Sequence, residues 1–378
     1  MFLALRDLAF AKGRFLLMSM IIALVAFLMT LLSGLASGLI KNNISGLMAL
    51  DVTHLAFEYN DRPNYRNSMV EREMWEGWRD AEGVLAVEPL GHTLFTARTP
   101  EGLPLDDVVL WGVEPGSFLE PEVTFGESLK GPDDGVIISA LLANKHDVKL
   151  GDMIVLDRVL TKLTVIGITD EQNIGHVPVI YTPMRKWQEA TYGPPGGPAP
   201  GESLPDILFD YASVIALKLT PDADIESVDI EWGTVTMDKQ LAYEASLGYK
   251  EEVQTVQMIQ GFMVVISALV IGAFFTIWTI QRTQEIGLVK ALGGSSAYLL
   301  RDTMAQALIL MLLAVGIGTF FAVWLGLSLE ESGKPFMLVR DNIAGSSGLL
   351  IVAGLIGSMV SVRLIARIDP IIALGRTR

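Results

Sequence analysis

Four long apolar stretches stand out from the pattern of hydrophobic and polar positions along the chain. They cover residues 15–40, 253–281, 303–329 and 342–362, and none of them contains a charged side chain. About 20 helical residues cross the hydrocarbon core of a bilayer, so each stretch is long enough to be a transmembrane helix. A cleaved signal peptide is the alternative for the first stretch. However, its apolar run is longer than that of a typical signal peptide, and no clear Ala-x-Ala site follows.

The region between the first and second stretches, residues 41–252, has the pattern of a folded domain outside the membrane. Short β-branched runs broken by glycine and aspartate predict strands at 135–139, 153–156, 163–168 and 178–181. The apolar spacing predicts helices at 141–146 and around 70–82, and the run GPPGGPAPG at 193–201 predicts a surface loop. The expected fold class is a membrane α-helical protein with four transmembrane helices and a large mixed α+β extracytoplasmic domain.

Charge is distributed unevenly along the chain. Residues 41–255 contain 16 Lys and Arg against 36 Asp and Glu, whereas the rest contains 12 basic and 7 acidic residues. The basic residues gather before the first apolar stretch, between the second and third, and after the fourth. Because Lys and Arg favour cytoplasmic loops, this predicts a multi-pass protein of the cell (inner or plasma) membrane with both termini cytoplasmic. The net charge of −15 argues against nucleic acid as a partner.

These patterns divide the chain into nine segments. The predicted order is an N-terminal interfacial helix (1–14), transmembrane helix 1 (15–40), the extracytoplasmic domain (41–252), transmembrane helix 2 with an outer stalk (253–281), a cytoplasmic coupling segment (282–302), transmembrane helix 3 (303–329), an outer loop (330–341), transmembrane helix 4 (342–362) and a cytoplasmic tail (363–378). Gly34 and Gly38 form a G-x-x-x-G motif, which predicts close packing between helices. Four helices can scarcely enclose a route across the bilayer, so we expect a homodimer.

The coupling segment has the spacing of a short amphipathic helix. Its apolar positions fall on one helical face: Ile286, Val289 and Leu292. Arg282 and Glu285 are spaced for an i,i+3 ion pair. An ordinary polar linker is the alternative, but a linker has no need of an apolar stripe. The pattern therefore favours a docking helix for a cytoplasmic partner.

The same segment resembles the cytoplasmic signature of the FtsX/MacB-type ABC transporter permeases. The motifs that carry the resemblance are Arg282, Glu285-Ile-Gly287 and Lys290-Ala-Leu-Gly293, then Arg367-Ile-Asp-Pro370 with Ala373-Leu374 near the C-terminus, and the stretch 135–168 of the outer domain. The order of one span, a large outer domain and three further spans also matches, so the resemblance covers almost the whole chain.

The resemblance implies a dimeric exporter permease or mechanotransmitter driven by a cytoplasmic ATPase that binds ATP and Mg. No G-x-x-x-x-G-K-[S/T] motif occurs in this chain, so we expect the ATPase to be a separate subunit. The residues expected to couple to it are Arg282, Glu285, Ile286, Gly287, Val289, Lys290, Leu292 and Gly293. The chain has no cysteine, and no catalytic or metal-ligand spacing stands out. We therefore expect no enzyme activity and no intrinsic cofactor.

Length and architecture are most similar to the stand-alone haem-exporter permeases of the family (HrtB-like), which implies efflux of haem. Lipoprotein-release, macrolide and peptide exporters share the same skeleton. Export of a lipid, peptide or drug, or ATP-driven regulation of an outer partner protein, therefore stays open. Haem iron is ligated by His, Met, Tyr or Cys side chains. The candidates for substrate contact are Met29 at a predicted helix seam near Ser33 and Gly34, and Tyr249, Glu251 and Glu252 at the outer end of the second span.

Overall fold

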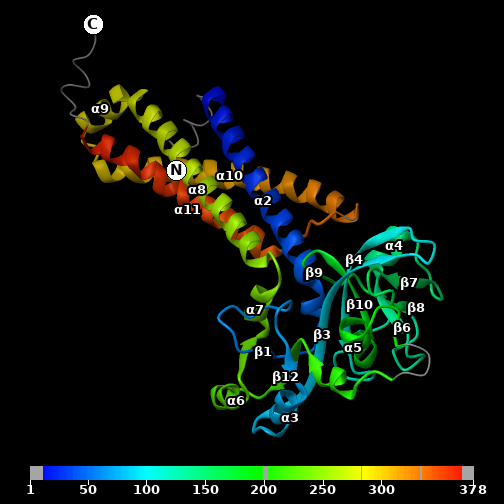
Figure 1. The fold of residues 1–378 in the computed structure, drawn as a ribbon. Coiled ribbons are helices and arrows are strands. Elements are labelled where there is room, and N and C mark those ends of the chain that lie inside the picture. Colours follow the sequence, from blue (N-terminus) through cyan, green and yellow to red (C-terminus); the bar gives the residue numbers. More distant parts are fainter. Residues whose placement is uncertain (1–11, 199–202, 282, 333, 368–378) are drawn as a thin grey trace. The chain divides into compact units, whose positions relative to one another are not determined.

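The computed structural model describes residues 12–198, 203–281, 283–332 and 334–367 and divides the chain into two compact units (Figure 1). The helical unit comprises Met1–Leu39 and Val253–Arg378, and the outer unit comprises Ile40–Glu252. The predicted interfacial helix and the end of the cytoplasmic tail fall largely outside the described residues.

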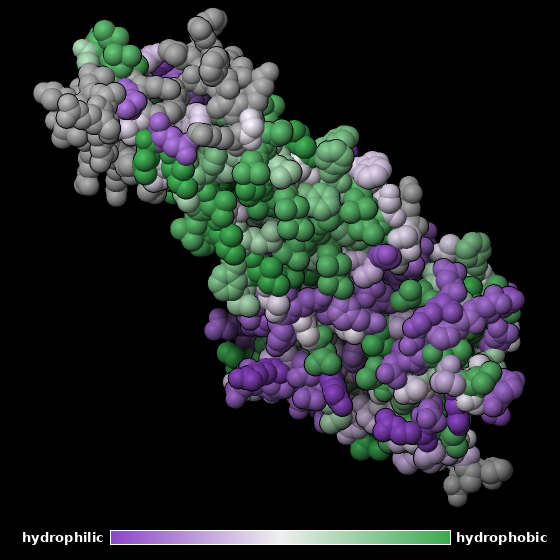
Figure 2. Space-filling model, turned by 90° about the horizontal axis from the view of Figure 1, so that it is seen from above, coloured by the Kyte–Doolittle hydropathy of each residue, from purple (hydrophilic) through white to green (hydrophobic). Residues whose placement is uncertain are grey.

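Long apolar helices form the helical unit. The helices that contribute to it are α2 (Lys12–Ala49), α8 (Tyr249–Gln281), α9 (Thr283–Ala291), α10 (Ser296–Glu331) and α11 (Arg340–Arg367). Within the described residues, α2, α8, α10 and α11 are long and apolar enough to cross a membrane, which confirms the four predicted spans. Figure 2 shows a largely hydrophobic surface over these helices, as expected for side chains that face lipid. The predicted stalk is part of α8, which is one continuous helix from Tyr249.

Glycines bring the helices of this unit close together. A Cβ atom at Gly272 of α8 would lie 2.7 Å from the carbonyl oxygen of Gly357 in α11, so only glycine permits this approach. The predicted helix–helix role of Gly34 and Gly38 is wrong in this chain. Both positions are instead filled by the backbone and ring of the loop segment at Phe336, and Gly34 accepts a hydrogen bond of 3.0 Å from the Met337 N–H. The G-x-x-x-G motif therefore predicts a helix surface that another segment can approach closely, but it does not predict whether that segment is a helix or a loop.

The outer unit is built on an eleven-stranded mixed sheet. Its strands follow the order β13-β1-β12-β3-β4-β10-β6-β8-β5, with β7 beside β3 and β8, and β9 beside β10. The strand bounds are β1 (His54–Glu58), β3 (Val84–Arg98), β4 (Pro104–Val113), β5 (Phe125–Gly126), β6 (Gly135–Ser139), β7 (Met153–Leu156), β8 (Lys162–Thr169), β9 (Asn173–Ile174), β10 (Val177–Pro183), β12 (Val214–Leu219) and β13 (Thr234–Asp238). A separate pair is formed by β2 (Val70–Glu71) and β11 (Tyr211–Ala212).

Short helices accompany this sheet. They are α3 (Arg72–Asp80), α4 (Ala140–His146), α5 (Met184–Tyr192), α6 (Ile225–Trp232), α7 (Lys239–Ala242) and the 3₁₀ turns η1 (Asp206–Asp210) and η2 (Tyr243–Ala245). The predicted strands at 135–139, 153–156, 163–168 and 178–181 are confirmed as β6, β7, β8 and β10, and the predicted helices as α3 and α4. The α4 helix begins after Ser139, whose Oγ accepts a hydrogen bond from the Leu141 N–H.

Strand β3 joins the two halves of the sheet. Its first half pairs with β12 up to Leu90, and its second half pairs with β4 from Gly91 onward. One apolar core contains Trp75, Trp78 and Trp187 from α3 and α5, and a second contains Trp111 of β4 and other strand residues. Because apolar side chains cover both faces, β6 is buried along its whole length and reads as a continuous apolar run.

Candidate functional site

Two glycines end helix α9, for which a coupling role is predicted, and a serine begins the next helix, α10. Gly293 has a φ of +93°, and the Gly294 N–H donates a 2.8 Å hydrogen bond to the Val289 carbonyl, which closes the helix in the manner of a Schellman motif. The Oγ of Ser295 then accepts a 3.1 Å hydrogen bond from the Tyr298 N–H and caps α10. The predicted short helix after the second span is therefore present, and it is isolated from α10 by a two-glycine turn.

The predicted apolar stripe of α9 does not form one exposed face. Ile286 is buried at 8% exposure, whereas Val289 is half-buried. Leu288 and Leu292 are 51% and 80% exposed and lie one helical turn apart. A docking partner would therefore meet Leu288 and Leu292, and spacing alone did not separate them from the inward-facing positions.

The other predicted coupling residues have mixed surroundings. Gly287 is buried and Lys290 is half-buried. Arg282 and the Glu285 side chain lie outside the described residues, so their predicted ion pair stays a prediction.

Met29 lies inside the helical unit. It is 2% exposed and belongs to an apolar cluster with Ile22 and Ala26 of α2 and Phe275 of α8. One turn away, a cavity of about 10 Å³ is lined by Val25 and other apolar side chains. That volume is far too small for a porphyrin ring, so a ligand could reach the Met29 sulfur only if the helices separate.

The predicted residues at the start of α8 belong to the outer unit. Tyr249 packs edge-on against Tyr243 with 6.1 Å between ring centroids, and Glu251 is exposed. The side chain of Glu252 is 18% exposed and is held by neighbours from other segments. We call these neighbours the Asn43 cluster: Asn42, Asn43, His176, Ser246 and Glu252.

Asn43 is the centre of this cluster. It is completely buried, and its Oδ1 accepts a 2.9 Å hydrogen bond from Ser246 Oγ. Its Nδ2 lies 3.4 Å from both Glu252 Oε2 and His176 Nε2, and these two atoms are themselves 3.4 Å apart. His176 Nδ1 also lies 2.9 Å from Asn42 Oδ1. The end of α2, the start of α8 and the β9–β10 turn are thus tied together by polar side chains.

A strained turn supplies the histidine of this cluster. Gly175 and His176 form the two-residue loop between β9 and β10, with φ values of +59° and +64°, as a type I′ hairpin requires. Positive φ is uncommon for a residue other than glycine, although histidine is among those that tolerate it. The conformation is held because the Gly175 N–H donates a 2.8 Å hydrogen bond to the Asn43 carbonyl.

The other outer histidines do not gather into a ligand site. His92 Nδ1 accepts a 3.0 Å hydrogen bond from the indole N–H of Trp111, and burial lowers the pKa of His92 to about 4. Its ring is therefore neutral at pH 7. Within the described ranges, no group of three or more His, Asp or Glu side chains is arranged to hold a metal ion.

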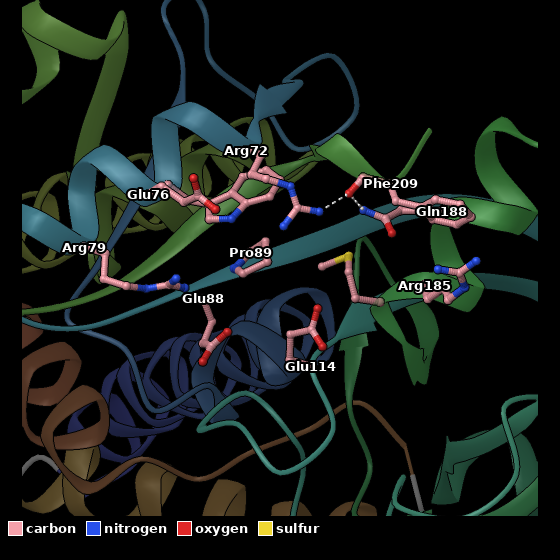
Figure 3. A pocket seen from close by; sticks show the side chains of 11 residues that line it. Arg72, Glu76, Arg79, Glu88, Pro89, Glu114, Arg185, Gln188 and Phe209 are labelled. Carbon is pink, nitrogen blue, oxygen red and sulfur yellow. Dashed lines mark hydrogen bonds between the residues drawn. The ribbon is translucent and has the colours of Figure 1, made fainter. Parts of the chain in front are cut away.

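A cavity of about 320 Å³ in the outer unit has no counterpart in the sequence predictions (Figure 3). It is lined by charged residues of both signs: Arg72, Glu76, Arg79, Glu88, Glu114 and Arg185. These residues come from α3, from β3, from the end of β4 and from α5, and more than 100 residues separate the first from the last. The sequence contains one indication of this cavity, namely that the charged residues Glu88 and Glu114 interrupt or directly follow apolar strand segments.

Two family models match this chain. The MacB-like periplasmic core domain matches residues 15–232, and the FtsX-like permease C-terminal matches residues 258–370. Three relatives carry the name "Putative hemin transport system permease protein HrtB". The one from Staphylococcus haemolyticus is 24% identical over 377 residues, which is 99% of both chains. The one from Staphylococcus epidermidis (strain ATCC 35984) is 24% identical over 375 residues, again 99% of both chains.

Solved structures of two outer domains are also similar to this chain. The periplasmic region of MacB from Actinobacillus actinomycetemcomitans is 14% identical, with a TM-score of 0.37, and the match covers 54% of this chain and 96% of that one. The extracellular domain of YknZ from Gram-positive bacteria is 18% identical, with a TM-score of 0.34, and the match covers 50% of this chain and 99% of that one.

Proposed function

This chain belongs to the family of ABC-type permeases that combine a MacB-like periplasmic core domain with an FtsX-like permease C-terminal, and from that premise we propose that it exports haem. The observation that carries the haem proposal is the match over 99% of both chains to relatives named for hemin transport. The spans and the outer domain lie within that match, so the similarity is not confined to a shared module. The proposed assembly is a homodimer with a separate cytoplasmic ATPase.

Met29 is the proposed haem ligand from the membrane. A thioether is a known axial ligand of haem iron, and Met29 lies in an apolar, water-poor setting where haem partitions. Because Met29 is 2% exposed, haem entry would require α2 to move away from α8 and α10. Tyr249, Glu251 and Glu252 are the proposed polar contacts, and Glu252 would have to exchange its contacts with Asn43 and His176 for the ligand.

The haem proposal is tested by titrating haem into the purified permease and recording the Soret band. Met29→Ala should shift the band and lower resistance of cells to toxic haem. Met18→Ala is the matched control, because Met18 is also on α2 and only 1% exposed, and it should leave the band unchanged. A wild-type protein that binds no haem would refute the substrate, and an unchanged band in Met29→Ala would refute only the ligand.

Docking of the ATPase is proposed at Leu288 and Leu292 of α9. Two exposed leucines one turn apart on a short helix form the kind of apolar anchor that a groove in a partner can bury. The Leu288→Ser/Leu292→Ser double variant and Glu285→Lys should reduce co-purification of the ATPase and uncouple transport. Ala291→Ser, an exposed position on the same helix, is the control. Full co-purification with the double variant would count against docking at α9.

The orientation with both termini in the cytoplasm is tested by labelling. The chain has no cysteine, so single cysteines report on one position each. Asp222→Cys in the outer unit and Ala291→Cys in α9 are both exposed. In intact cells an impermeant maleimide should label the first and not the second. Labelling of both would refute the proposed topology, and would leave the family assignment intact.

A further inference from the structure

The charged cavity of the outer unit lies at a break in the sheet. Strand β3 exchanges its partner β12 for β4 between Leu90 and Gly91, and two of the lining residues, Glu88 and Pro89, immediately precede that exchange. Strands β4 and β10 are parallel, and the lining residues Glu114 and Met184 directly follow their last residues. Cavities outside the carboxyl ends of parallel strands, where strand order changes, are the usual place for ligands in such sheets.

One buried amide points an unused acceptor into this cavity. Gln188 is 4% exposed, and its Nε2 donates hydrogen bonds of 3.0 Å to the Phe209 carbonyl and 2.9 Å to the Tyr211 carbonyl. Because both partners are carbonyl oxygens, the side-chain atom that faces them must be the Nε2 nitrogen. The opposite atom of the amide is therefore the oxygen Oε1. Figure 3 shows that oxygen directed into the cavity, and no described group donates a hydrogen bond to it. The oxygen is open to the cavity, so a donor on a bound ligand could form a hydrogen bond with it in place of water.

The carboxylates of the cavity are also unneutralised. Among the described residues, neither Glu88 nor Glu114 has a basic group within 4.0 Å, and the same is true of Glu76. Two of the three arginines are already engaged, Arg72 with Asp210 at 2.7 Å and Arg185 with Glu189 at 3.7 Å. Among the described residues Arg79 has no carboxylate that close, and its guanidinium donates a 3.5 Å hydrogen bond to the Val87 carbonyl. The three carboxylates therefore outnumber the one arginine of the cavity that has no ionic partner.

Burial raises the pKa of Glu88, Arg79 partly opposes that shift, and the nearby Glu114 carboxylate adds to it. Burial and the Glu114 charge therefore destabilise the carboxylate form of Glu88, and a positive charge between Glu88 and Glu114 would stabilise it. The aromatic ring of Trp75 and the side chain of Met184 provide apolar surface beside these charges. Such walls suit the alkyl part of an amine better than a hydrated metal ion.

We propose that this cavity binds an organic cation, an alkyl ammonium or guanidinium group, through Glu88, Glu114 and the Oε1 of Gln188. The group would donate hydrogen bonds to these oxygens and place its carbon chain against Trp75 and Met184. Small polyamines and the Lys or Arg side chains of a polypeptide share this chemistry. The site does not involve Met29, α8 or α9, so it does not depend on haem export.

The test is isothermal titration calorimetry on the purified full-length permease in nonionic detergent at 0.15 M salt. Spermidine and a tetralysine peptide are the two cationic probes, and a tetraglutamate peptide is the negative control. Glu88→Gln and Glu114→Gln keep the shape of the side chain and remove its charge, and each should weaken cation binding by about tenfold or more. Glu73→Gln is the matched control, because Glu73 is an exposed carboxylate of the same outer unit that does not line the cavity.

If both cationic probes bind, an alkyl ammonium group is sufficient for binding. If only tetralysine binds, the site prefers the side chain of a polypeptide. Either result supports the site. The proposal is overturned if neither probe binds. It is also overturned if Glu73→Gln weakens binding as much as Glu88→Gln, because the peptide would then be held only by general surface charge. Glu114 is exposed, so Glu114→Gln keeps the test valid if Glu88→Gln does not fold.

Discussion

The histidine at the centre of the outer sheet makes the stability of this protein depend on pH in a predictable way. His92 accepts a hydrogen bond from Trp111 through Nδ1, which only a neutral ring can do. Burial holds its pKa at about 4, against an ordinary value of 6.5. As pH falls, the unfolded chain therefore takes up a proton on His92 near pH 6.5, whereas the folded protein takes it up only near pH 4.

The size of the effect follows from these two values. Stability contributed by His92 is intact above pH 6.5, is lost as pH falls from 6.5 to 4, and does not fall further below that. Between pH 7.5 and pH 5 the unfolding free energy should decrease by about 2 kcal/mol from this residue alone. For a domain of this size, that corresponds to a fall in Tm of about 4–8 °C.

The measurement compares thermal unfolding of the wild-type permease and His92→Gln in nonionic detergent from pH 7.5 to pH 5. Glutamine keeps an acceptor for the Trp111 indole and does not titrate in this range. Many groups contribute to the pH dependence of both proteins, so the informative quantity is the difference between the two curves. On acidification, the Tm of His92→Gln should fall by less than the Tm of the wild type. Parallel curves would show that His92 is not held neutral in the folded protein.

Three further substitutions follow from the packing. Asn43→Ala removes the hydrogen bond to Ser246 and leaves buried polar partners unsatisfied, so it should lower stability by about 1–3 kcal/mol in thermal unfolding. Gly38→Val places a side chain against the loop backbone at Phe336 and should destabilise the permease by about 1–3 kcal/mol, whereas Gly316→Val, with open space at its Cβ, should not. Ser295→Ala removes the cap of α10 and should cost about 1 kcal/mol in the same assay, and an unchanged Tm would refute the capping role.

The sequence by itself determined the features that depend on short windows of residues. An uncharged apolar run of more than 20 residues has one stable environment, so the four spans were predictable from composition along the chain. The strand β6 was equally local, because its three consecutive β-branched residues between Gly135 and Ser139 are typical of a strand. The helix α4 was predictable from the apolar spacing that follows. The motifs of the coupling segment and the order of the spans were sufficient to indicate the permease family.

Only the tertiary structure decided which distant residues meet. Glu252 was predicted as a candidate substrate contact at the outer end of the second span, but the structure pairs its carboxylate with Asn43, which lies 209 positions away in the sequence. The side chain of Phe336 fills the surface of Gly34, which the motif assigned to another helix. The charged cavity combines α3, β3, the end of β4 and α5, and none of these segments has a functional pattern alone. A local pattern records what one segment prefers to bury, whereas a site depends on which segments fold against one another, and that choice is made by the packing of the whole unit.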